Sequence, residues 1–187
     1  MGNTAFEGKR LSDTKVLTGK VRFSYAHFFE PWPDGDPNAK YRVCVLADKD
    51  DTATAKAFEE AIENAKKAGL QKFGSGFKGA KVADPIHDGD AEKPDDEVYA
   101  GKLYVNCSNT RPPQVVDINL NRIEDEDEVY SGCYGRVTIN FYPYSVNGHM
   151  GIAASLQNVQ KLEDGERLGG GRTSAIADFG GGDDFLA

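Results

Sequence analysis

Basic, amide and tyrosine side chains recur at alternate positions in four stretches of this sequence that have strand character. Successive side chains of a strand point to opposite faces, so alternation assigns each residue to one face. In each stretch the apolar residues share one face, and the other face carries the polar groups. The polar set comprises Lys20 and Arg22, Lys40 and Arg42, Lys102, Tyr104 and Asn106, and Arg136, Thr138, Asn140 and Tyr142.

Such a face has a definite chemistry. Lysine and arginine can follow phosphates, and tyrosine rings can stack on unpaired bases, which together favour single-stranded nucleic acid. For any one strand, an ordinary solvated face explains the pattern equally well. Acidic residues are absent from these positions on all four strands, although the chain has 30 acids and 22 bases. We therefore interpret the four strands as one selected basic face.

The stretch "LQKFGSGFKGAK" at residues 70–81 adds aromatic rings between lysines on a glycine-rich loop. We include Lys72, Phe73, Phe77 and Lys78 among the candidate binding residues. Two interpretations stay open for the phenylalanines, which can anchor the loop in the core or stack on bases. Trp32, which lies between two prolines, is predicted to be a packing plug, and His27 to be structural.

The net charge of −8 conceals an uneven distribution. Residues 84–97 hold seven acids, residues 124–128 hold five, and the last 19 residues hold three. Without these segments, 15 acids and 20 bases remain, so the rest of the chain is basic. Acidic loops therefore offset a basic surface, and the average charge does not exclude a nucleic-acid partner.

Catalytic and metal-binding patterns are weak. The sequence has no H-E-x-x-H, G-x-S-x-G or Walker A motif, and "GSGFKG" at residues 74–79 lacks the strand before and the helix after it that a dinucleotide site needs. Cys44, Cys107 and Cys133 are widely spaced in apolar stretches, and the three histidines are equally scattered. We predict buried thiols, no metal, no cofactor and no enzymatic activity.

The pattern of elements predicts a mainly β fold. About six strands and one helix, from Asp50 or Asp51 to a stop at Gly69, match an OB-fold-like, five- to six-stranded antiparallel barrel with one inserted helix. Residues 70–98 are predicted to form a long loop. We expect one domain over residues 1–168 and a flexible, disordered C-terminal tail over residues 169–187.

The tail carries two Asp-Phe pairs on a glycine spacer, at Asp178-Phe179 and, after Asp183, at Asp184-Phe185. With the OB-like body, the inserted helix and the late acidic segment, this tail makes the chain similar to the single-stranded-DNA-binding proteins of bacteriophages. The resemblance implies a tail whose acids mimic phosphates in the protein's own groove. It also implies that the phenylalanine docks on replication or recombination proteins.

These observations lead to one principal expectation and two alternatives. We expect sequence-independent binding and protection of single-stranded DNA (ssDNA) in phage replication and recombination, in the host cell cytoplasm. No apolar run reaches the roughly 18 residues of a membrane helix, so no membrane partner is expected. The oligomeric state stays open, with a homo-oligomer as one alternative. The competing functions are a virion β-protein and a Mg²⁺-dependent nuclease or resolvase.

Overall fold

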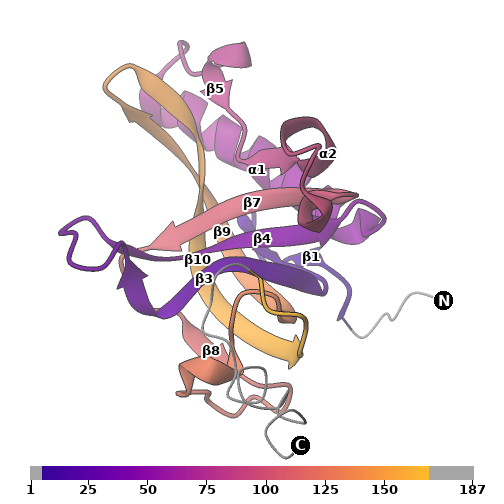
Figure 1. Cartoon of the computed structure of the whole chain (residues 1–187). Helices are drawn as coiled ribbons and strands as arrows, with labels where there is room; N and C mark the ends of the chain where they lie inside the picture. Colours follow the sequence, from indigo (N-terminus) through magenta and orange to yellow (C-terminus); the bar gives the residue numbers. More distant parts are fainter. Residues whose placement is uncertain (1–5, 169–187) are drawn as a thin grey trace, which may run out of the picture.

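Five long strands form a barrel in residues 6–168, the part of the chain that this computed structural model describes (Figure 1). They are β3 (Val21–Trp32), β4 (Lys40–Asp48), β7 (Lys102–Asn109), β9 (Tyr134–Val146) and β10 (His149–Glu163). The predicted tail, with Asp178, Phe179, Asp183, Asp184 and Phe185, lies outside the described residues.

The pairing of these strands closes a ring. Strand β3 pairs with β4, β4 with β7, β9 with β10, and β9 with β3, all antiparallel. The ring is closed by β7 and β10, which run parallel where Ser108 lies opposite Ser155. The prediction of a mainly β, OB-type barrel is confirmed. One detail differs, because the closing contact is parallel and not antiparallel.

Short strands extend this barrel into a sheet of ten strands. Strand β2 (Lys15–Leu17) pairs with β9, and β1 (Lys9–Arg10) pairs with β2. Strands β5 (Val82–Ala83) and β8 (Gln114–Val116) pair with β10. Strand β6 (Ile86–Asp88) pairs with the edge of β7 and leads into the short helix α2 (Gly89–Glu92). Single 3-10 turns lie at Gly79–Lys81, Glu97–Tyr99 and Glu126–Glu128. The predicted long loop at residues 70–98 therefore contains several short elements.

Helix α1 (Thr52–Phe73) packs on β9 and on the N-terminal strands. The Asp51 carboxylate caps its first turn by accepting a hydrogen bond from the Thr54 amide at 3.1 Å. Ala57, Phe58 and Ile62 lie on its buried face. The predicted stop at Gly69 is wrong, since the helix continues to Phe73. Gly69 instead leaves room for the Phe77 ring, which occupies the space that a side chain there would need.

The barrel core contains the apolar face that alternation predicted. Val21, Phe23, Val45 and Val137 are fully buried, and Phe23 meets Phe28 edge to face with ring centroids 5.3 Å apart. The three cysteines are also buried and free, as predicted. Burial raises the pKa of the Cys44 thiol to about 11, so this thiol is protonated at neutral pH.

In residues 6–168, no helix has the length and apolar character required to cross a membrane. The same residues contain no group of three histidine, cysteine or carboxylate side chains placed to hold a metal ion.

Candidate nucleic-acid interface

An irregularity in β3 sets the geometry of the candidate site. Phe23 and Phe28 both point into the core, although strict alternation would place residues five apart on opposite faces. The pairing of β3 with β4 shifts between Ser24 and His27, and Tyr25 takes the left-handed conformation with φ of 49°. This bulge turns the rings of Tyr25 and His27 outward while Phe28 stays buried.

Three side chains of β3 form an aromatic ridge, which we define as Tyr25, His27 and Trp32. The Tyr25 ring is 67% exposed and Trp32 is 47% exposed, which is unusual for such large rings. His27 stacks on Trp32 with ring centroids 4.9 Å apart and an angle of 11° between the planes. Burial, and then the charge of Arg42, hold the pKa of His27 below its usual range. The ridge therefore carries a neutral imidazole at neutral pH.

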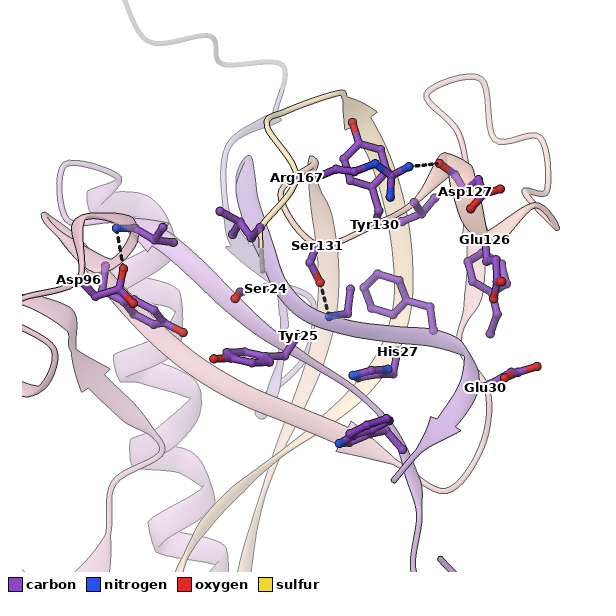
Figure 2. Close-up of a pocket in the computed structure, with 18 residues that line it drawn as sticks. Ser24, Tyr25, His27, Glu30, Asp96, Glu126, Asp127, Tyr130, Ser131 and Arg167 are labelled. Carbon is purple, nitrogen blue, oxygen red and sulfur yellow. Dashed lines mark hydrogen bonds between the residues drawn. The ribbon is translucent and has the colours of Figure 1, made fainter. Parts of the chain in front are cut away.

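The ridge separates two hollows, since all three of its residues line both. The larger is a cleft of about 850 Å³ and the smaller a pocket of about 270 Å³. Figure 2 shows Tyr25 and His27 on one side of the β3 ribbon and Ser131, Tyr130 and Arg167 on the other. A flat, extended ligand could thus lie along exposed rings with a depression on either side.

Polar groups from the second and third barrel strands line the smaller pocket. Arg42 comes from β4, and Asn106 and Ser108 come from β7. The Arg42 Nε atom is buried and has no hydrogen-bond partner in residues 6–168. Lys40 lies opposite Trp32 in the β3–β4 pairing. Because Arg42 lines this pocket, its positively charged guanidinium is available to an anionic ligand there.

The larger cleft has a mixed electrostatic character. Its lining includes the carboxylates of Glu30, Asp96, Glu126 and Asp127. Two cations lie over rings beside it, Arg167 at 4.2 Å from the Tyr130 centroid and Lys93 at 5.3 Å from that of Tyr99. The acids disfavour phosphates in this cleft, so phosphates are expected on the Arg42 side of the ridge.

The structure divides the residues predicted for the basic face. Arg42 and Asn106 line the smaller pocket, and Lys40 lies beside the ridge. Lys20 instead pairs with Glu163 at 2.6 Å, and Lys102 pairs with Asp48. Arg22 donates to the backbone carbonyls of Gly132 and Glu166, while Arg136 donates to those of Thr18 and Glu7. Four of the predicted cations are thus engaged within the chain.

Two candidate aromatic residues are buried, and for Tyr104 this shows that the expected exposure is wrong. Tyr104 is only 8% exposed because the segment 84–100 covers it, with His87 stacked on its ring and Tyr99 edge-on. Phe77 is 2% exposed and packs over Gly69, which settles the open question in favour of a core anchor. Tyr142 is exposed on β9.

The remaining loop candidates lie away from the ridge. Lys72 and Phe73 belong to the last turn of α1, and Lys78 follows it. In Figure 1 this end of α1 lies near β5, with β7 and β4 between it and β3. These residues therefore do not belong to the same groove as Arg42 and Asn106.

Sequence reasoning missed the aromatic ridge. Trp32 was predicted to be a packing plug, and this is wrong because almost half of its surface is exposed. Tyr25, Lys93 and Arg167 were not among the candidates. The available signal was the density of aromatic residues in "SYAHFFEPW" at residues 24–32, which exceeds what one buried face of a strand can hold.

The fold and the site together define an OB-fold barrel whose groove lies against its second and third strands, the face that commonly takes oligonucleotides in this class. A family profile described as "Enterobacter phage Enc34, ssDNA-binding protein" matches residues 14–186. The chain therefore belongs to the Enc34 family of phage ssDNA-binding proteins.

Similar individual proteins come from phages. Protein p50 of Acyrthosiphon pisum secondary endosymbiont phage 1 is 32% identical over 172 residues, covering 88% of this chain and 92% of that protein. The ssDNA-binding protein of bacteriophage Enc34, solved in complex with ssDNA, is 27% identical with a TM-score of 0.78, covering 90% of this chain and 97% of that one. The gp2.5 protein of bacteriophage T7, at 18% identity, a TM-score of 0.60 and coverage of 90% and 95%, supports the fold alone.

Proposed function

We propose that this protein binds ssDNA without sequence preference and protects it during phage DNA replication and recombination, in the cytoplasm of the host cell and without enzymatic activity. One observation carries the proposal. The exposed rings of Tyr25 and Trp32 line the smaller pocket together with the cationic side chain of Arg42. Membership of the Enc34 family supports the same function.

The proposed mode of binding follows from the arrangement of charges. Bases would stack on Tyr25 and Trp32, whose flat faces accept any base. The backbone would run on the other side, where Lys40 and Arg42 can meet phosphates and Asn106 can donate a hydrogen bond. The acids that line the larger cleft would keep phosphates out of it, which orients the strand across the ridge.

A titration with oligo(dT) tests this function, because Trp32 is the sole tryptophan and lies in the ridge. We expect quenching of its fluorescence on binding. Two to four phosphate contacts predict a slope of log K against log salt of about −1.4 to −2.8, from roughly −0.7 per phosphate. An absence of binding at low salt would overturn the proposal and favour the virion protein. Cleavage of a labelled oligo(dT) in the presence of Mg²⁺ would favour the nuclease.

We also propose a division of labour between residues 1–168 as the ssDNA-binding domain and residues 169–187 as a partner-binding tail. The support is the sequence of the tail, with its Asp-Phe pairs and acids, and the family resemblance. Deletion of residues 169–187 should abolish capture of replication or recombination proteins from infected-cell lysate. Phe185→Ala should reduce this capture with little change in oligo(dT) affinity, since it removes an aromatic anchor but no charge. Equal capture by the wild type, the deleted form and Phe185→Ala would contradict the proposal.

A further inference from the structure

The C-terminal end of α1 combines positive charge with exposed apolar groups. Residues 66–81 hold five lysines and no acid, and we call this region the basic end. Leu70 is 45% exposed and Phe73 37% exposed. The centroid of the Phe73 ring lies 5.5 Å from that of the buried Phe77 ring, and the Lys72 ammonium lies 5.3 Å from the Phe73 centroid. These contacts hold Phe73 at the surface, so the apolar patch is a fixed feature of the fold.

A second region has the opposite charge. Residues 117–128 hold six acids and one arginine, a net charge of −5, and we call them the acidic lobe. At its tip Ile118 is 52% exposed and Leu120 is 71% exposed. Exposed aliphatic residues so close together within a strongly acidic stretch are unusual. No part of residues 6–168 covers them.

The tip of the acidic lobe is rigid. The Asp117 carboxylate accepts hydrogen bonds from the amides of Asn119 and Asn121 at 2.8 and 2.9 Å. The Leu120 amide donates to the Asp117 carbonyl at 3.0 Å, and Leu120 has a φ of 66°, which a leucine seldom adopts. Such strain persists only where the surroundings impose it, and it is typical of functional sites. The loop thus presents its two aliphatic side chains in a pre-organised form.

The two regions cannot meet within one chain. Figure 1 shows β8, which leads into the acidic lobe, at the opposite extreme of the molecule from β5 and the end of α1. Opposite charges and exposed aliphatic side chains make the two surfaces complementary. We propose that the acidic lobe of one copy docks on the basic end of the next copy. The contact is heterologous, so it joins protomers head to tail, into an open row unless the rotation between copies closes a ring.

The chemistry favours a second copy over DNA as the occupant of both surfaces. The acidic lobe repels phosphates, so nucleic acid cannot cover Ile118 and Leu120. Aliphatic groups such as Leu70 gain little from a base face but much from burial against other aliphatic groups. A row of protomers would also align successive ridges along one strand; this role on DNA rests on the proposed function, whereas the contact itself does not.

The first test removes the apolar tip in the full-length chain with Ile118→Ser and Leu120→Asn, because asparagine tolerates the left-handed conformation. Sedimentation without DNA, at low salt, should show concentration-dependent association of the wild type and a loss of at least about tenfold in the variant. Leu11→Ser, at another exposed aliphatic residue, should associate like the wild type. Equal association of wild type and variant would overturn the proposal.

The second test reverses charge at exposed positions outside the aromatic cleft. Glu124→Lys and Glu128→Lys with Asn119→Lys and Asn121→Lys change the lobe from −5 to +1 and give a lobe-reversed protein. Lys67→Glu, Lys78→Glu and Lys81→Glu change the basic end from +5 to −1 and give an end-reversed protein. Each alone should fail to associate, because its lobe and its end then carry like charges. An equimolar mixture should associate again, since every junction joins opposite charges. Failure of the mixture to restore association would overturn the proposal.

Oligo(dT) binding separates this inference from the proposed function. On an oligonucleotide that accommodates one protomer, the three association-defective variants (Ile118→Ser with Leu120→Asn, lobe-reversed and end-reversed) should bind like the wild type. On a long strand they should lose cooperativity, except in the charge-reversed mixture. Weaker short-strand binding by the end-reversed protein alone, without any loss of self-association, would make the basic end a DNA surface and overturn the contact. A wild type that associates but binds no oligo(dT) would overturn only the proposed function.

Discussion

The outward face of β4 and β7 has two halves that differ in their surroundings. In the half next to the aromatic ridge, Arg42 and Asn106 line the smaller pocket. In the other half, Cys44, Leu46 and Tyr104 are buried together with Tyr99, beneath the segment 84–100. Strand alternation places both sets on the same side of the sheet. Alternation therefore decides the face of a residue, but a distant segment decides whether that face meets solvent.

The covering segment also limits where DNA could lie. It carries seven acids between residues 84 and 97, and it is held by the pairing of β6 with β7. Lys49 pairs with Asp88 at 2.6 Å and with Asp90 at 2.7 Å. The acids would repel a phosphate backbone from the covered half. We therefore expect a DNA strand to bind along the open half, the half with Arg42, Asn106 and the aromatic ridge.

The largest effect that distinguishes the halves is expected at Tyr104. Tyr104→Ala should lower the free energy of unfolding by about 3–5 kcal/mol, because it removes a buried ring from the covered half. The folded fraction should bind oligo(dT) normally. Urea unfolding measures the first quantity and fluorescence titration the second. Tyr142→Ala, at an exposed tyrosine, is the control and should change stability by less than about 0.5 kcal/mol. A stable Tyr104→Ala variant with weak DNA binding would reverse the assignment of the halves.

In the open half, the aromatic ridge should dominate affinity. Tyr25→Ala and Trp32→Ala should each cost about 1–3 kcal/mol of ssDNA binding, because each removes a stacking platform. Anisotropy of a labelled oligo(dT) reports binding even when the tryptophan is absent. Thermal unfolding should be nearly unchanged, as both rings are exposed. If neither substitution weakens binding, the strand follows another path over the barrel.

The salt dependence should separate free cations from engaged ones. Arg42→Met should flatten the slope of log K against log salt by about 0.7, the loss of one phosphate contact. Lys20→Met should leave this slope unchanged, because Lys20 pairs with Glu163. Titrations at four salt concentrations measure both slopes. Equal changes in the two variants would show that the ion pair opens on binding and would extend the track toward β9.

The smallest effect concerns the ion pairs between Lys49 and the covering segment, residues 84–100. Hydrogen bonds from Lys49 lower the pKa values of Asp88 and Asp90. A lowered folded-state pKa contributes stability that is present above the unfolded value, 3.8, and is lost as the pH falls through the folded value. Lys49→Met should therefore reduce stability slightly at neutral pH, and the difference from the wild type should vanish in acid.

Reactivity of the cysteines reports locally on whether the Lys49 ion pairs hold the segment 84–100 in place. Cys44 lies beneath Tyr99, whereas Cys107 and Cys133 lie in the main core. In Lys49→Met at neutral pH, a thiol reagent should modify Cys44 faster than in the wild type, while the other two cysteines keep their rates. An equal increase in the modification rates of all three cysteines would indicate global unfolding and contradict a local role of the Lys49 ion pairs.

Much of the fold could be predicted from the sequence. The alternating positions of Val21, Phe23, Val105 and Val137 identified the core face because period-two alternation is a local property. The helix was recognised from its cap at Asp51 and its apolar stripe. Its extension past Gly69 was missed, because the reason for that glycine is the Phe77 ring eight residues away.

The sequence by itself determined which side chains leave the core, which segments are acidic, and that three cysteines are buried. Only the tertiary structure decided which outward residues are open. Tyr104 and Arg42 have the same local pattern, yet one lies beneath residues 84–100 and the other lines a pocket. A bulge at Tyr25, fixed by pairing with β4, turned the ridge outward. Exposure and ion pairing depend on contacts between residues far apart in the chain, and local periodicity contains no information about such contacts.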